Sequence, residues 1–487
     1  MSESQGKGAG EPPRPWTTVL SRHWKIAVLG AAGFATVAAT TTIAAIRDDE
    51  KSEKAEARSA TAAADGKGLP AGGGEGEGED GHDKGGQGRG GKKHDDKYGG
   101  HPGDDATYVE CDPNDLIASL VDLNADSGGE LVLAKGCTYT LTVNEDGNGL
   151  PVIVQPITIH GNGATIQRAA NADNFRFFEV GAGGDLKLRH LTLTRGKAAP
   201  DENGGALNVH AGGRLDLDRV TVTRNTVDDV TANNEDGGGV YNEGITTIRN
   251  STISKNLSDD GAAVFNEGGK LEIHTSRVTG NISDEADGYG AIYNEDGTAK
   301  ISKSLVGYNY GYNAGGVYSS GTTEVEDSAV VYNHGSFGGG VYHEFGTLAV
   351  RDSTIAYNTA SANSGGGLHL AASAVIKGSK VYANAATASN GGGIFTDLDE
   401  DEAVSIRDTK IADNQAPGNG ARGGGVYVGE EDQVRLTDVK VTGNISDLEA
   451  GGVYNQGTVT TYGKVRIIDN VPTNCEGSPS PVPNCFG

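Results

Sequence analysis

Residues 237–256 read GGGVYNEGITTIRNSTISKN, and this stretch is one complete copy of a motif that recurs along the chain. Each copy opens with a glycine pair or a close variant of it, then an aliphatic and usually an aromatic residue. It ends about 17 residues later at an asparagine. Ten asparagines close successive copies at intervals of 24 to 31 residues: Asn225, Asn256, Asn281, Asn309, Asn333, Asn358, Asn384, Asn414, Asn444 and Asn470. Such a period is typical of a solenoid, in which each repeat buries its apolar side against the next.

The pattern inside each copy indicates strands. Apolar and polar residues alternate with a period of two, as in Thr246-Thr247-Ile248, and no copy has the longer amphipathic pattern of a helix. A unit of about 25 residues has room for three short strands and three turns. The sequence therefore predicts an all-β fold, a right-handed parallel β-helix of about twelve coils over residues 107–475, since parallel crossovers are right-handed by default.

Two positions of the repeat predict ladders of stacked side chains. The closing asparagine tolerates left-handed backbone, and its amide can bond to the same amide in the next coil. The position after the aliphatic residue predicts aromatic stacking at the strand spacing of about 4.8 Å. It holds Tyr241, Phe265, Tyr293, Tyr318, Tyr342, His369, Phe395, Tyr427 and Tyr454. Both ladders are interpreted as structural.

The ends of the repeat region carry features of caps, which a stack of coils needs. Residues 112–127 begin with Asp112-Pro113 and predict a helix, with one apolar face made of Leu116, Ile117, Leu120 and Val121. Four cysteines flank the repeats, and three pairings of them are possible. We expect the two local pairs, Cys111–Cys137 and Cys475–Cys485, the second closing a C-terminal cap over residues 476–487. Disulfides indicate an oxidising compartment.

The N-terminal part predicts export. Residues 26–46 carry no charge and follow Arg14, Arg22 and Lys25, which places residues 1–25 in the cytoplasm. The length of the uncharged segment suits a transmembrane anchor, whereas its Ala, Gly and Thr content also suits a cleaved signal, and both alternatives stay open. Residues 47–106, rich in Gly and in charges of both signs, predict a disordered linker. The β-helix is thus expected at the cell surface, either anchored or secreted.

Charge limits the class of partner. The net charge is −26, which disfavours nucleic acid and anionic lipid and suits cations or neutral sugars. We expect a polysaccharide or another cell-wall component as the partner, with no nucleic acid. The membrane is a second partner if residues 26–46 stay uncleaved.

One position of the repeat varies freely, the residue before the closing asparagine. In seven copies it is Arg224, Lys255, Gly280, Ala383, Asp413, Gly443 or Asp469, and a position that accepts both charges is exposed. In three successive copies it is tyrosine: Tyr308, Tyr332 and Tyr357, with Tyr310 and Tyr312 nearby. An exposed aromatic row on a rigid scaffold predicts a carbohydrate-binding face. The alternative is a ladder that only stabilises its neighbours.

A metal site has one candidate segment. Asp397, Asp399 and Asp401 alternate along the chain and could offer oxygens to Ca²⁺. Glu402 stands where an EF-hand loop needs glycine, and no helices flank the segment, so an acidic solvated loop is the alternative. No other cofactor is expected.

Three stretches carry a family resemblance. Cys137-Thr-Tyr-Thr-Leu, LPVIVQPITIHGNGATI (150–166) and GGDLKLRHLTLTRG (183–196) resemble the opening of the pectin-lyase-like β-helix superfamily. The repeat itself is similar to those of polymorphic outer-membrane proteins, which are surface adhesins. The resemblance implies a polysaccharide lyase, a glycoside hydrolase or an adhesin. The Gly-His-Gly, Arg-Ile-Lys and Asn-Thr-Asp words of polygalacturonase-like hydrolases are absent.

No catalytic residue is therefore predicted. We expect a binding or structural role at the cell surface, with lyase or hydrolase activity and protein-binding adhesion as alternatives.

Overall fold

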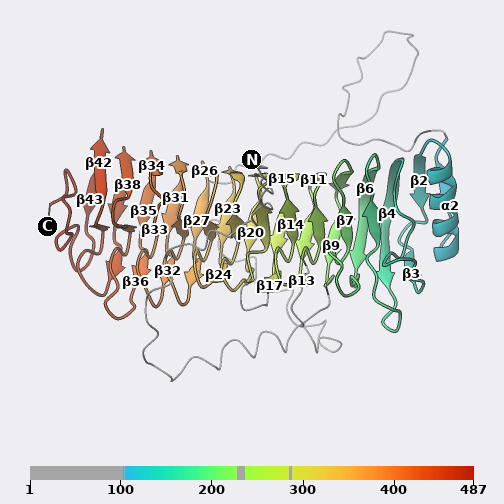
Figure 1. Cartoon of the computed structure of the whole chain (residues 1–487), viewed down its shortest axis with the longest axis horizontal. Coiled ribbons are helices and arrows are strands. Elements are labelled where there is room, and N and C mark those ends of the chain that lie inside the picture. Colours follow the sequence, from blue (N-terminus) through green and yellow to red (C-terminus); the bar gives the residue numbers. More distant parts are fainter. Residues whose placement is uncertain (1–102, 104, 228–235, 284–287, 487) are drawn as a thin grey trace, which may run out of the picture. The chain divides into compact units, whose positions relative to one another are not determined.

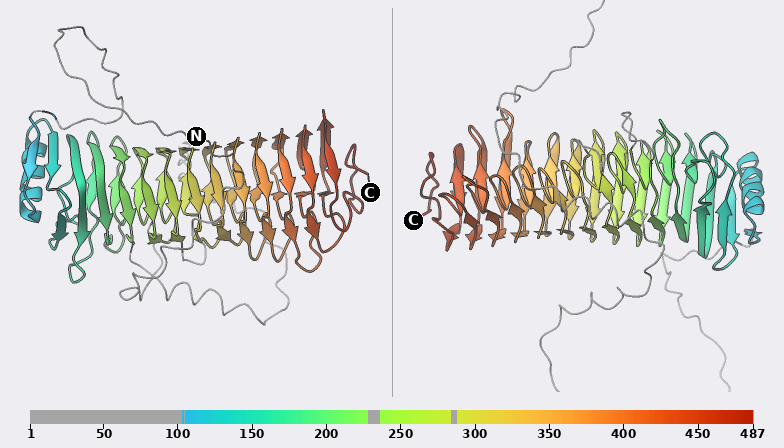
Figure 2. Two further views of the ribbon diagram at one scale, coloured as in Figure 1. Left: turned by 180° about the vertical axis from the view of Figure 1, so that it is seen from behind. Right: turned by 90° about the horizontal axis from the view of Figure 1, so that it is seen from below.

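The computed structural model describes residues 103, 105–227, 236–283 and 288–486, which form a parallel β-helix (Figures 1 and 2). Its stack has about 13 turns, against the twelve or so that the repeat predicts. The all-β parallel β-helix is confirmed. The predicted cytoplasmic segment 1–25, the apolar segment 26–46 and nearly all of the linker 47–106 lie outside the described residues. Within the described part of the chain, no helix is long and apolar enough to span a membrane.

Apart from the coils at the two ends, each coil contributes one strand to each of three faces. The first face is formed by β2 (Gly129–Leu133), β4 (Pro156–Arg168), β6 (Asp185–Thr194), β8 (Arg214–Asp218), β11 (Ile245–Arg249), β15 (Lys270–His274), β19 (Thr298–Ser302), β22 (Thr322–Glu326), β26 (Thr347–Arg351), β30 (Ala374–Lys377), β34 (Ala403–Arg407), β38 (Gln433–Thr437) and β42 (Thr458–Tyr462). At its N-terminal end β1 (Thr107–Val109) pairs with β2.

The second face continues the first after a turn. It is formed by β3 (Thr138–Leu141), the C-terminal parts of β4 and β6, β9 (Thr221–Thr223), β12 (Thr252–Ser254), β16 (Arg277–Thr279), β20 (Leu305–Gly307), β23 (Ala329–Val331), β27 (Thr354–Ala356), β31 (Lys380–Tyr382), β35 (Lys410–Ala412), β39 (Lys440–Thr442) and β43 (Arg466–Ile468).

The third face is a separate sheet made of β5 (Phe178–Val180), β7 (Leu207–Val209), β10 (Val240–Asn242), β14 (Val264–Glu267), β18 (Ile292–Glu295), β21 (Val317–Ser319), β25 (Val341–His343), β29 (Leu368–Leu370), β33 (Ile394–Thr396), β37 (Val426–Val428) and β41 (Val453–Asn455). Two-residue strands lie between the second and third faces: β13 (Leu257–Ser258), β17 (Ile282–Ser283), β24 (His334–Gly335), β28 (Thr359–Ala360), β32 (Ala385–Ala386), β36 (Gln415–Ala416) and β40 (Ile445–Ser446).

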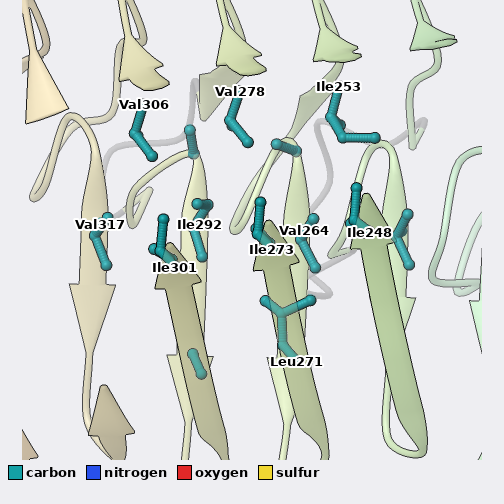
Figure 3. Close-up of a cluster of buried hydrophobic side chains, with 14 of the residues drawn as sticks. Ile248, Ile253, Val264, Leu271, Ile273, Val278, Ile292, Ile301, Val306 and Val317 are labelled. Atoms are coloured by element: carbon teal, nitrogen blue, oxygen red, sulfur yellow. The ribbon is translucent and has the colours of Figure 1, made fainter. Parts of the chain in front are cut away.

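The core runs along the inside of the coils. Alternate residues point inward, so that Ile248 of the first face, Ile253 of the second and Val264 of the third are fully buried (Figure 3). Their counterparts in the next coil, Ile273 and Val278, repeat the arrangement. Burying one such side chain stabilises the fold by about 1.5–3 kcal/mol, and no coil completes that burial without its neighbours.

The asparagine ladder is confirmed and lies inside the turn. The backbone N–H and the Nδ2 of Asn309 both donate to Oδ1 of Asn333, at 3.1 and 3.0 Å, and Asn333 repeats this toward Asn358. The left-handed residue, however, is the one before the asparagine. Its φ is +56° at Lys255 and +57° at Asp413. The prediction that the asparagine itself is left-handed was therefore wrong by one position. Because the ladder holds the asparagine side chain, the preceding residue makes the turn.

The aromatic ladder is also confirmed. Ring centres of Tyr241 and Phe265 lie 5.4 Å apart, and those of Phe395 and Tyr427 lie 4.9 Å apart. Tyr241, Phe265 and Tyr318 are buried, as expected for a structural ladder.

The predicted caps are present at both ends. Helix α2 spans Pro113–Ala125, and the carboxylate of Asp112 accepts the Asn114 N–H at 2.8 Å. Leu116 and Leu120 are fully buried. Val121 was predicted on the same face but is exposed, because the first coil covers a narrower stripe of the helix than the sequence pattern does. Both local disulfides form, Cys111–Cys137 beside α2 and Cys475–Cys485 at the C-terminal end.

Candidate functional site

The predicted tyrosines lie at the turn that follows the second face. Tyr308, Tyr332 and Tyr357 come directly after β20, β23 and β27, with φ of +59°, +56° and +57°. Left-handed backbone directs each side chain away from the core, and the three rings are 60%, 46% and 44% exposed. We call these three residues the tyrosine row.

The rings of the tyrosine row stack in parallel. The centres of Tyr308 and Tyr332 are 5.0 Å apart at an interplanar angle of 9°, and those of Tyr332 and Tyr357 are 4.8 Å apart at 4°. Tyr382 is the last residue of β31. Its ring meets that of Tyr357 edge-on, with ring centres 5.4 Å apart at an interplanar angle of 79°. The inner ring faces therefore cover one another, and Tyr382 borders one end of the row.

The other end of the row is different. In the preceding coil the equivalent position is Gly280, with φ of +66°, which has no side chain to place against Tyr308. A Cβ at this position would come no closer than 3.9 Å to its nearest neighbour, the side chain of Lys255. The outer face of Tyr308 is accordingly the ring face that the repeat leaves uncovered, and Tyr308 is the most exposed ring of the three.

The two other predicted tyrosines do not join the row. Tyr310 is half-buried and stacks on His334 in the next coil, with ring centres 5.4 Å apart at 9°. Burial lowers the pKa of His334, which keeps its imidazole neutral at physiological pH. Tyr312 is exposed, and its backbone carbonyl accepts the Ser336 N–H at 2.6 Å. The structure thus joins three of the five predicted residues in one stack and adds Tyr382.

The acidic segment lies in the connection from β33 to β34. Asp397, Asp399 and Asp401 are exposed, and the Asp397 N–H donates to the Leu370 carbonyl at 3.0 Å. The neighbouring Glu402 carboxylate accepts from the Ser373 hydroxyl. Among the described residues, no group of three or more acidic, His or Cys side chains is arranged to hold a metal ion. Calcium binding by this segment stays a prediction.

A second candidate was missed by the sequence analysis. Asp236 precedes the glycine pair of its coil, and its side chain is only 8% exposed. Its Oδ1 has no hydrogen-bond partner within the described ranges. Burial, together with the charges of Asp260, Asp259 and Glu295, raises the pKa of Asp236 to about 9, so this carboxyl keeps its proton at neutral pH.

The surroundings of Asp236 are rich in tyrosine and carboxylate. The Tyr241 hydroxyl donates to Glu267, and burial raises the pKa of Glu295. The Tyr289 backbone N–H donates to the Asp260 carboxylate at 2.6 Å. The available signal was an Asp-Gly step at the start of two successive coils, Asp236-Gly237 and Asp260-Gly261.

Comparisons with known proteins give structural likenesses, among them the two below. No family model matches the chain, and no curated protein matches it. The A-module of mannuronan C-5 epimerase AlgE6 from Azotobacter vinelandii is similar with a TM-score of 0.41 and 14% sequence identity, over 73% of this chain and 94% of that one. Tailspike protein 3 of bacteriophage CBA120 is similar with a TM-score of 0.33 and 12% identity, over 77% of this chain and 62% of that one.

Proposed function

We propose that this protein binds carbohydrate at the cell surface through the tyrosine row. The observation that carries the proposal is that three successive coils place tyrosine in an exposed, left-handed position that the other coils fill with glycine, alanine or a charged residue. Because Arg224, Lys255 and Asp413 have the same left-handed backbone, the turn itself does not select tyrosine. An exposed tyrosine combines an apolar ring face with a hydroxyl, which suits a binding surface.

The geometry of the tyrosine row suits the binding of a sugar ring. The outer face of Tyr308 offers a flat apolar surface beside Gly280, and the phenol groups of the row can donate and accept hydrogen bonds. The sugar ring would stack on that outer face. The hydroxyls of the following sugars would then run past the ring edges of Tyr332 and Tyr357.

Two disulfides support the proposed location, because they persist in oxidising compartments. In this proposal the β-helix over residues 107–475 and the cap over residues 476–487 stand outside the cytoplasm, and residues 47–106 link them to the N-terminal segment. The ligand is a polysaccharide or another cell-wall component. A distant relation to the pectin-lyase-like superfamily belongs to the same proposal.

A glycan array tests the proposal. The full chain is compared with the triple variant Tyr308→Ala, Tyr332→Ala and Tyr357→Ala, which should fold because Ala383 occupies the same position with φ of +53°. Asp413→Ala and Asp469→Ala, at the same position in coils outside the row, are the matched controls. We expect the triple variant to lose the glycans that the wild type and both controls retain. Glycan binding that persists in the triple variant would contradict the proposal.

Asp236 favours a second candidate function, a polysaccharide lyase or glycoside hydrolase. A carboxyl group that stays protonated at neutral pH can act as a general acid, and tyrosines lie around it. The full chain would be incubated with acidic and neutral polysaccharides, with and without Ca²⁺. Release of unsaturated or reducing sugar that is lost in Asp236→Asn would establish this candidate, and absence of release would exclude it for the polysaccharides tested.

A further inference from the structure

Four cations stand in a single column near the C-terminal end of the β-helix. Lys380, Lys410, Lys440 and Arg466 are the first residues of β31, β35, β39 and β43, and each pairs directly with the next. All four are exposed. In earlier coils the same column is mostly uncharged, with Thr221, Thr252, Ala329 and Thr354, and Arg277 is an isolated cation between Thr252 and Leu305. Like charges directly opposite each other on neighbouring strands destabilise a sheet, so folding does not explain this column.

A second set of cations lies across the turn on the first face. Lys377, the last residue of β30, pairs in register with Arg407, the last residue of β34. In the coil after that of Arg407, the guanidinium carbon of Arg435 lies 5.3 Å from the centre of the Tyr462 ring. We call these residues together the basic band: Lys377, Lys380, Arg407, Lys410, Arg435, Lys440 and Arg466.

Earlier coils show what a balanced face looks like. Arg249 pairs with Asp216 at 2.8 Å, and Lys300 pairs with Glu324 at 2.9 Å and with Glu326 at 2.8 Å. Arg351, the last cation before the band, pairs with Glu324 at 2.7 Å. Among the ion pairs found in the described part of the chain, none involves a residue of the basic band.

Five carboxylates lie close to the band: Asp352, Asp408 and Asp438 in the turns between the first and second faces, and Asp413 and Asp469 in the turns after the second face. Asp438 accepts the backbone N–H of Lys464 at 2.8 Å. Five carboxylates do not balance seven cations. In a chain of net charge −26, this local excess of positive charge stands out as an anion-binding surface.

A groove of about 440 Å³ runs beside the band. Five consecutive strands of the first face line it, β26, β30, β34, β38 and β42, so the groove follows the axis of the stack. Arg407 and Arg435 supply the positive charge of the groove. Its hydrogen-bonding groups come from Ser405, Gln433 and Thr460. Val375 adds an exposed apolar side chain. Charged, polar and apolar groups in one extended groove suit a chain of sugars better than a single small anion.

We propose that the basic band and this groove bind a linear anionic glycan laid along the axis of the β-helix. Strand spacing sets one cation about every 4.8 Å along the column, which is comparable to the length of one sugar unit in an extended chain. Acidic groups repeated along such a chain would meet the cations in successive coils. This site is distinct from the tyrosine row, and either can fail without the other.

The test compares two variants of equal charge change in the full chain. In the band variant, Lys380→Thr, Lys410→Thr and Lys440→Thr introduce the residue that this column holds in earlier coils. In the matched control, Lys270→Thr, Lys300→Thr and Arg351→Thr remove three cations whose partners are carboxylates. The probes are a polyuronate, a sulfated glycan, a neutral dextran and single-stranded poly(dT).

We expect the wild type to bind at least one of the two anionic glycans, with an affinity that falls as salt rises, and not to bind dextran at this site. The band variant should lose about tenfold or more in affinity at low salt, and its salt slope should fall by about two, the value for three fewer ionic contacts to a single chain. The control should stay within about twofold, and the Tyr308, Tyr332 and Tyr357 triple variant should bind as the wild type does.

Equal losses in the band variant and in the control would overturn the proposal, as would a wild type that binds neither anionic glycan. Tighter binding of poly(dT) than of both glycans would assign the band to nucleic acid instead. Circular dichroism and the urea midpoint of the band variant establish that any loss is not unfolding.

Discussion

At the scale of single residues, the position before the closing asparagine separates folding from function. The asparagine is buried in every coil and serves the ladder, whereas its predecessor is left-handed and projects outward. The backbone there admits glycine most easily, yet arginine, lysine, alanine and aspartate also occupy it, so the turn does not require tyrosine. For Tyr308, Tyr332 and Tyr357, we propose a ligand as the reason.

Asp236 gives a residue-scale prediction about pH. Its folded pKa of about 9 lies above the unfolded value near 3.9, so the folded state binds the extra proton between these limits. Stability from this group is therefore greatest below pH 4 and falls as pH rises toward 9, by at most about 1.4 kcal/mol per pH unit. Asp236→Asn should remove this fall and raise the urea midpoint most at pH 8–9.

Urea midpoints between pH 5 and pH 9 check this prediction. Asp413→Asn, in an exposed turn, is the control and should follow the wild type. Parallel pH profiles for Asp236→Asn and the wild type would contradict the assignment of a buried, protonated carboxyl.

At the scale of the elements, each turn depends on the turns before and after it. Asn333 accepts two hydrogen bonds from Asn309 and donates to the Val306 carbonyl and to Asn358. Asn333→Ala would leave the backbone N–H of Asn309 and one of its two Nδ2 hydrogens without an acceptor in a buried site, while the other Nδ2 hydrogen keeps the Val278 carbonyl. An unsatisfied buried donor costs about 1–3 kcal/mol, so we expect a loss of about 2–5 kcal/mol.

Hydrogen exchange locates that loss. The amide of Asn309 should exchange much faster in Asn333→Ala, while amides in α2 keep their protection because solenoid coils interact mainly with their neighbours. Asp413→Ala, in an equivalent turn but with an exposed side chain, should change stability by less than about 0.5 kcal/mol. An unchanged Asn309 amide would contradict the role of the ladder.

The elements also show how far the sequence goes. Period, glycine pair and asparagine predicted the β-helix and both ladders, because these depend on residues close together within the repeat. The helical cap and both disulfides were predicted from local features that flank the repeats, Asp112-Pro113 and the two nearby cysteine pairs. The tyrosine row was predicted as exposed, since its position tolerates both charges. The uncovered face of Tyr308 followed only when the coils were aligned and Gly280 was seen beside it.

Asp236 and the basic band were missed for the same physical reason. Repeats of 24 to 31 residues place Lys380, Lys410, Lys440 and Arg466 far apart in sequence, and the varying lengths of the turns hide their register. Burial of Asp236 likewise depends on residues of other coils. Sequence spacing alone gives neither the register of the four cations nor the burial of Asp236.

At the scale of the whole molecule, the β-helix presents different chemistry on different surfaces. An acidic chain carries a basic band on its C-terminal coils, a tyrosine row at the turn after the second face, and a buried acid near the third face. A solenoid allows this because outward side chains can vary while the inward ones maintain the stack. The central claim concerns the tyrosine row, and it leads to the most direct measurement.

That measurement is the calorimetric affinity of Gly280→Lys for the glycan selected by the array. The substitution keeps all three tyrosines and places a side chain over the outer face of Tyr308. Lys255 already occupies this position in the preceding coil with φ of +56°. Asp469→Lys is the control, at the same exposed position with φ of +60° in a coil outside the row. The account predicts a loss of about tenfold or more, near 1.4 kcal/mol, for Gly280→Lys and none for Asp469→Lys. Equal, wild-type affinity in both variants would contradict it.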